Sequence, residues 1–147
     1  SFNMPYTFND EKFPVVTVVR SEYADNDDEV YQFRDYWKKQ YERKQNFSFI
    51  FFLDKVKDFQ LKSAYLTAKI IGEMKKEPEH YLKKTIIIFK DQLLINIITL
   101  MCTIQKPISQ LFLLNSNKNN IDKCVRAILS NEMPDEEISV VNSCFQK

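Results

Sequence analysis

Residues 46–54 read NFSFIFFLD, an apolar run with almost no polar interruption. A strand with one face in water would alternate apolar and polar side chains, and this segment does not. Strands that are apolar on both faces are typical of parallel sheets, in which helices cover each face. We therefore expect helices on both sides of residues 47–53. The run ends at Asp54, whose carboxylate could be catalytic or could simply mark the end of the strand.

Strand and helix patterns alternate along the rest of the chain. Strands are expected at residues 5–8, 13–20, 47–53, 82–90 and 110–114, and helices within residues 21–45, 55–80, 91–105 and 119–129. This order predicts one α/β domain over residues 1–147. Its central sheet should be mostly parallel, with four to five strands and helices on its faces. The first two strands should form an antiparallel hairpin at one edge.

The first two helices are predicted from apolar residues at helical spacing. Asp25, Asn26 or Asp27 should cap the first helix. Its buried stripe should be Val30, Phe33, Trp37 and Tyr41. The stripe of the second helix should be Leu61, Ala64, Tyr65, Ala68, Ile71 and Met74.

Composition excludes several classes of function. A formal net charge of +1 argues against broad electrostatic binding of nucleic acid. A single glycine cannot supply a phosphate-binding loop or a dinucleotide fingerprint. Three cysteines without CxxC spacing suggest an intracellular, cytoplasmic protein with reduced thiols. Neither a secretory signal nor a transmembrane run is visible. The abundance of Lys, Asn, Ile, Phe and Tyr suits an AT-rich genome, such as that of a protist or a large DNA virus.

Few residues in the sequence are candidates for catalysis or metal binding. Asp54 and Asp58 follow a central strand at the sheet edge where α/β proteins often bind ligands, so they could hold magnesium or act as a general base. The simpler interpretation is that Asp54 ends the strand and that Asp58 helps to start a helix, as Asp91 does further on. His80, the single histidine, is expected to be a solvated loop residue. We therefore predict no catalytic residue, no metal ligand and no cofactor.

The helix at residues 91–105 is unusual, because no charge occurs between Asp91 and Lys106. Its apolar arc is wider than packing on a sheet requires, so either neighbouring segments cover it or it faces a partner chain or an apolar ligand. Leu94, Ile97 and Met101 should face the sheet. The flanks, Leu93 and Leu100 on one side and Ile95 and Cys102 on the other, are the candidate interaction surface. The C-terminal tail, with Val140, Val141 and Phe145, could cover one flank, which would leave the other for a homodimer.

This layout resembles the fold of STAS domains and of the core of CRAL-TRIO lipid-transfer domains. The resemblance rests on FPVVTVVR (13–20), FSFIFFLD (47–54), the helix after KVKDFQ (55–60), YLKKTIIIFK (81–90) and KPISQLFLLNS (106–116). It covers about Phe13 to Ser116. STAS regulators carry a phosphorylated serine beside acidic and glycine residues, whereas QLKSAYL around Ser63 has neither neighbour. CRAL-TRIO domains are longer, with an N-terminal helical extension and a gate helix, so this chain resembles a minimal core.

Both resemblances imply a binding or regulatory module rather than an enzyme. We expect a non-catalytic protein-interaction or regulatory module, with a protein partner or a second copy of the chain. The alternative is a reduced CRAL-TRIO-like binder of a lipid or other apolar ligand. A third and weaker alternative is an enzyme that uses Asp54 and Asp58 with a divalent metal.

Overall fold

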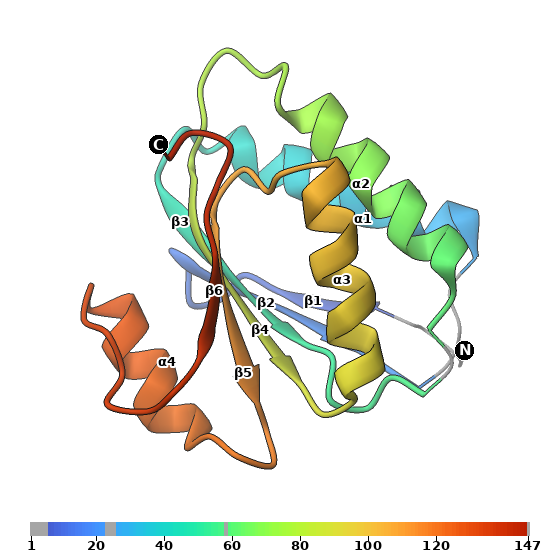
Figure 1. The fold of residues 1–147 in the computed structure, drawn as a ribbon. Coiled ribbons are helices and arrows are strands. Elements are labelled where there is room, and N and C mark those ends of the chain that lie inside the picture. The colour runs from blue at the N-terminus through green and yellow to red at the C-terminus, as the bar shows by residue number, and fades with distance from the viewer. Residues whose placement is uncertain (1–5, 23–25, 58, 147) are drawn as a thin grey trace.

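Figure 1 shows the fold in a computed structural model, which describes residues 6–22, 26–57 and 59–146. A six-stranded sheet has the strand order β1-β2-β3-β4-β5-β6. The strands are β1 (Tyr6–Asn9), β2 (Val15–Arg20), β3 (Phe47–Phe52), β4 (Leu82–Phe89), β5 (Gln110–Asn115) and β6 (Ser139–Val141). Strands β2 to β5 are parallel, whereas β1 and β6 pair antiparallel at the two edges. The predicted α/β class is therefore confirmed, and β6 is an additional strand.

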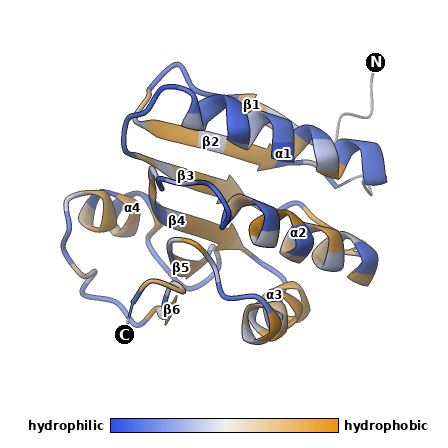
Figure 2. Cartoon of the chain, turned by 90° about the horizontal axis from the view of Figure 1, so that it is seen from above, coloured by the Kyte–Doolittle hydropathy of each residue, from blue (hydrophilic) through white to orange (hydrophobic). Residues whose placement is uncertain are grey.

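In the part of the chain that the structure describes, four helices flank the sheet: α1 (Asp27–Tyr41), α2 (Leu61–Met74), α3 (Gln92–Ile104) and α4 (Ile121–Leu129). Helices α1, α2 and α3 lie side by side on one face, and α4 lies on the other (Figures 1 and 2). Alternate residues of β3 point to these two layers. Phe49 packs in the cluster of α1 and α2, and Ile50 packs in that of α4. Helices thus cover the apolar strand from both sides, as its composition predicts.

The layer beneath α1 is rich in aromatic side chains. Phe33 of α1 has its ring centroid 5.9 Å from that of Phe49 and 5.5 Å from that of Phe51. Trp37 and Tyr41 continue the buried stripe that the sequence predicts for this helix. Full burial of one such side chain contributes about 1.5–3 kcal/mol to the free energy of folding. This stripe therefore accounts for much of the stability with which α1 packs on the sheet.

Local side chains set the start of two helices. The Asn26 side chain accepts a hydrogen bond from the Glu29 backbone N–H, and the Glu29 carboxylate accepts one from the Asn26 backbone N–H. This reciprocal pair is a capping box, which fixes the first turn of α1. At α3, the Asp91 carboxylate accepts from the Leu93 N–H at 2.9 Å. Both Asn26 and Asp91 lie where the sequence predicts a helix start.

Helix α2 is rotated about its axis, so that its buried face differs from the one that the sequence predicts. Leu61 and Tyr65, which were expected in the buried stripe, are 64% and 65% exposed. The buried residues of the helix are Ser63, Ala64, Leu66, Ile70 and Met74. The predicted stripe was therefore wrong in part. The physical reason is that α2 lies between α1 and α3, so these neighbours determine which of its two overlapping apolar rows is buried.

None of the helices in the described ranges has the length and the apolar character needed to cross a bilayer.

Candidate functional site

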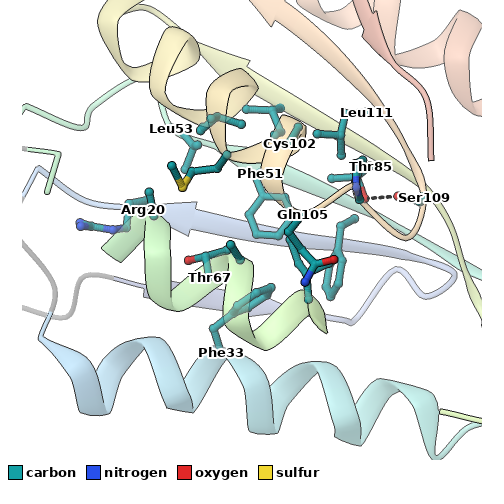
Figure 3. A pocket seen from close by; sticks show the side chains of 18 of the residues that line it. Arg20, Phe33, Phe51, Leu53, Thr67, Thr85, Cys102, Gln105, Ser109 and Leu111 are labelled. Carbon is teal, nitrogen blue, oxygen red and sulfur yellow. Dashed lines mark hydrogen bonds between the residues drawn. The ribbon is translucent and has the colours of Figure 1, made fainter. Parts of the chain in front are cut away.

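An apolar cavity of about 170 Å³ lies between the sheet and the helices α2 and α3 (Figure 3). The sheet contributes large side chains to its wall, among them Phe51, Ile87 and Leu111. The helices contribute Ala64, Thr67, Ala68 and Ile71 from α2, and Leu94, Ile98, Met101 and Cys102 from α3. The arrangement provides a partly open apolar space next to the central strands.

The cavity exists because α2 turns small residues toward the sheet. Ala64, Thr67 and Ala68 face inward, whereas the larger Leu61 and Tyr65 of the same helix face outward. Protein interiors are normally packed as densely as organic crystals. Leu61 and Tyr65, turned inward, would fill this space, but they face outward, and the buried Leu66, Ile70 and Met74 do not line it.

The cavity is elongated across the sheet. Arg20, at the end of β2, and the Thr85–Ser109 pair lie at opposite ends of it in Figure 3. The strand register places Val19 beside Phe52, and Phe52 beside Ile88, so Arg20 is level with Phe89. Thr85 lies four residues earlier in β4, a separation of roughly 13 Å at about 3.3 Å per residue. The cavity therefore runs from the carboxyl edge of the parallel strands toward their amino edge.

Most polar atoms on the wall have partners within the protein. The Thr85 and Ser109 hydroxyls hydrogen-bond each other at 2.6 Å, and the Thr67 hydroxyl donates to the Ser63 carbonyl at 2.8 Å. The Gln105 side-chain carbonyl accepts a hydrogen bond from Lys75. These groups need no ligand to satisfy them, so they leave the wall effectively apolar.

Arg20 is the one charged side chain among the described residues of the wall. It is 4% exposed, its guanidinium lies 5.2 Å from the centroid of the Tyr6 ring, and its Nη1 donates to the Ser21 carbonyl at 3.2 Å. A sequence signal for this position exists. Arg20 has the same parity as Val16 and Val18, so β2 places its side chain on the buried face.

A shallower cleft of about 590 Å³ opens at the same carboxyl edge. Its described lining is mixed in charge and consists of Ser21, Glu22, Asp54, Lys55, Val56, Lys57, Lys90 and Asp91. Lys57 and Glu22 form an ion pair at 2.9 Å. Cleft and cavity share Val56, so the two spaces adjoin.

The structure brings Asp54 and Asp91 to this cleft, while Asp58 lies outside the described residues. Asp91 caps α3, as the simpler interpretation predicts. Within the described ranges, no three His, Cys, Asp or Glu side chains gather closely enough to hold a metal ion.

We expect Asp54→Asn to change the melting temperature by less than about 2 °C, because a substitution away from the core alters stability by roughly 0.5 kcal/mol or less. Magnesium titrated into the wild-type protein should release no heat. Differential scanning and isothermal titration calorimetry measure these two quantities. Saturable magnesium binding that disappears in the variant would instead support the metal-dependent enzyme.

The four candidate interaction residues of α3 fall into two pairs. Leu93 and Leu100 are 65% and 56% exposed. Ile95 is 5% exposed and belongs to the cluster between α3 and the sheet, and half-buried Cys102 lines the cavity. Burial raises the pKa of the Cys102 thiol, which keeps it protonated at neutral pH. Of these four residues, Leu93 and Leu100 are therefore the pair that another molecule could contact.

His80 is not the solvated loop residue that the sequence predicts. It is half-buried, its Nδ1 lies 3.0 Å from the Tyr41 hydroxyl, and its ring centroid lies 5.0 Å from that of Phe145. The histidine thus connects α1 with the C-terminal segment. In the C-terminal segment, Phe145 contacts His80, and Val141 packs in the α3 cluster.

No family model, no curated protein and no solved structure matches this chain.

Proposed function

We propose that the chain is a non-catalytic module that binds a small apolar ligand in the cavity beneath α2 and α3. The observation that carries this proposal is a space of about 170 Å³ with an almost entirely apolar wall. An engineered cavity of about 150 Å³, lined by Leu, Ile and Phe side chains, stays dry and binds benzene. A space of this size and chemistry can therefore take a single ring or a short hydrocarbon chain.

The orientation of α2 supports the same proposal. An unfilled cavity destabilises a fold in proportion to its volume, at about 24 cal/mol per Å³. Leu61 and Tyr65 on the outer side of α2 show that the helix carries apolar volume that does not enter the cavity. A ligand would supply the missing contacts and would stabilise the folded state by mass action.

Intrinsic fluorescence tests the proposal directly, because the single tryptophan, Trp37, is 3% exposed and lines the cavity. We expect 1-octanol, titrated into the protein after any bound ligand has been removed, to change Trp37 emission saturably and to raise the melting temperature. Glycerol serves as the polar control and should change neither quantity. An octanol titration without saturation and without thermal stabilisation would overturn the proposal.

A second candidate function, interaction with another copy of the chain, rests on the outer face of α2 and α3. In the described ranges, seven large apolar side chains are markedly exposed, and five belong to these two helices: Leu61, Tyr65, Leu93, Leu100 and Ile104. Figure 2 shows the strongly apolar character of α3. An apolar patch gathered on one surface is typical of an interaction site.

The charges at the ends of α3 favour a second copy as the occupant of this face. The helix itself is uncharged, with Asp91 before its first residue and Lys106 after its last. If two copies pack with their α3 helices antiparallel about a two-fold axis, each Asp91 lies beside Lys106 of the other copy. The apolar centre and the complementary ends then meet in one interface.

A further inference from the structure

We propose that the apolar ligand enters the cavity between α2 and α3, and that the Gln105 side chain is a gate that closes one end of this entrance. This inference rests on the proposed apolar ligand and adds its route into the protein. Three observations carry it: the exposure of the cavity wall, the contact of Gln105 with Gly72, and the hydrogen bond from Lys75 to Gln105.

The cavity wall reaches the surface mainly where α2 and α3 face each other. Among the wall residues that the structure describes, eleven are half-buried, and seven of these lie on the two helices or at Gln105, which follows α3. Ala68 and Cys102 are examples from each helix. The strand residues Thr85 and Leu111 on the same wall are only 5% and 7% exposed. The space between the helices therefore leads from the surface to the strands.

Helix α2 presents a row of small residues in this region. Ala64, Ala68 and Gly72 are four residues apart, so they lie on one face of the helix. Gly72 is the single glycine of the chain, and its φ angle is not positive. Glycine inside a helix lowers stability relative to alanine, so its presence here needs another reason.

The side chain of Gln105 supplies that reason. A β-carbon at position 72 would lie 2.7 Å from the Gln105 Nε2 atom, closer than a β-carbon approaches another heavy atom in proteins. The Gln105 Oε1 atom accepts a hydrogen bond from Lys75, the C-terminal cap of α2. Since Gln105 directly follows α3, its amide bridges the C-terminal ends of the two helices (Figure 3).

Gln105 is placed to open as well as to close the entrance. It lines the cavity and is half-buried, so it stands between the apolar space and water. Its hydrogen bond joins two flexible side chains, and side chains at the surface change rotamer within nanoseconds. Opening therefore requires the loss of one hydrogen bond and no movement of the backbone. Because the gate closes over the empty and the occupied cavity alike, it should change the rates of entry and exit and not the affinity.

The carboxyl edge of the parallel strands is the competing entrance. Leu53 and Phe59 are half-buried wall residues near that edge, and the charged cleft adjoins the cavity there at Val56. Val56 is 8% exposed, and an apolar molecule would have to pass the charged side chains of the cleft. The entrance between α2 and α3 is instead flanked by exposed apolar side chains, such as Leu100 and Ile104, so it suits an apolar ligand better.

The test measures the exchange of 1-octanol by NMR line shapes, which give the association and dissociation rates together. In Gln105→Ala, we expect both rates to rise by about twofold to tenfold, because one hydrogen bond shifts an opening equilibrium by such a factor. Octanol affinity should stay within about a factor of two of the wild-type value. A purely structural role of Gln105 would lower affinity or melting temperature without raising the association rate.

Lys75→Met removes the hydrogen-bond donor and keeps an apolar side chain of similar length. It should also raise both rates, and the Lys75→Met/Gln105→Ala double variant should be no faster than Gln105→Ala, because both changes open one gate. Lys76→Met is the matched control, since Lys76 is the exposed neighbour and does not line the cavity. It should exchange octanol at the wild-type rates.

Gly72→Ala tests the packing of the gate independently of any ligand. In the wild type the new methyl group would meet the Gln105 side chain, whereas in Gln105→Ala that space is free. We therefore expect Gly72→Ala to raise the melting temperature more in Gln105→Ala than in the wild type. Equal gains in both proteins would overturn the role of Gly72 in the gate.

The outcomes separate this inference from the proposed function. Octanol binding with exchange rates that Gln105→Ala and Lys75→Met leave unchanged would overturn the gate and leave the apolar site intact. Exchange that is faster in Phe59→Ala and unchanged in Gln105→Ala would place the entrance at the carboxyl edge and would also overturn the gate. Absence of octanol binding to the wild type would overturn the proposed function, and this inference with it.

Discussion

Ala68→Met is expected to weaken octanol binding by at least about tenfold while the protein stays folded. Ala68 lies on α2 and lines the cavity, so a longer apolar side chain at this position extends into the space that the ligand would occupy. Filling a cavity commonly stabilises a protein by about 0.5–2 kcal/mol. We therefore expect loss of binding together with an unchanged or raised melting temperature, which distinguishes a blocked site from an unfolded one.

Ala127→Met is the matched control. Ala127 is half-buried on α4, against the opposite face of the sheet, and does not line the cavity. Both substitutions add the same atoms to a helix, so general effects of methionine on helix stability are shared. Octanol affinity should remain at the wild-type value in Ala127→Met. If Ala68→Met binds octanol normally, or if both variants lose binding equally, the ligand does not occupy this cavity.

Much of the fold can be predicted from the sequence because its central strands are apolar on both faces. The runs in β3, β4 and β5 have no alternation, and this property alone indicates a parallel sheet between helix layers. The short strand β6 is different. Its three residues cannot display a strand period, and only their pairing with β5 makes them a strand. Tertiary contact, not local pattern, defines this element.

The orientation of apolar helices is harder to predict than their existence. In α3, the sequence places Ile97 and Met101 with Leu94 toward the sheet, yet Ile95 is buried and Ile97 is only half-buried. The helix is turned toward Ile95 because Val141 of β6 packs in the same cluster. A helix that is apolar nearly all round has no polar face to fix its rotation, so its neighbours determine it.

The cavity could not be predicted because it depends on side-chain volumes contributed by several helices and strands. It depends on small side chains of α2 facing large ones of β3 and β4 across a defined distance. The pattern shows Ala64 and Ala68 as ordinary members of an apolar stripe. The burial of Arg20 was accessible to prediction, since its parity in β2 directs its side chain to the buried face.

Ile95→Lys and Leu100→Lys are expected to have opposite effects, although both add a charge to α3. Ile95 is 5% exposed, so lysine there would remove apolar packing and bury an unpaired ammonium. We expect a loss of about 4 kcal/mol or more in the free energy of unfolding, which is a large share of the stability of a typical domain. Leu100 is 56% exposed, and lysine there should change that free energy by about 0.5 kcal/mol or less.

The effect of Leu100→Lys should appear in assembly. If two copies pair through α3, the introduced lysine lies at the centre of an apolar interface, and dimer affinity should fall at least about tenfold. Sedimentation velocity, with circular dichroism as the check on folding, measures both quantities. Met133→Lys is the control, because Met133 is 63% exposed and lies outside α2 and α3. It should remain dimeric.

The end charges provide an independent test of the antiparallel arrangement. Asp91→Asn keeps a capping side chain at α3 and removes the negative charge, and Lys106→Gln removes the positive one. Each substitution should lower dimer affinity modestly and make that affinity less dependent on salt. The double variant should lose no more dimer affinity than either single variant, because the two residues act as one pair. A wild-type monomer at high concentration would exclude self-association. A wild-type dimer that Leu100→Lys leaves intact would place the interface on another surface, because a buried lysine at this position could not be tolerated.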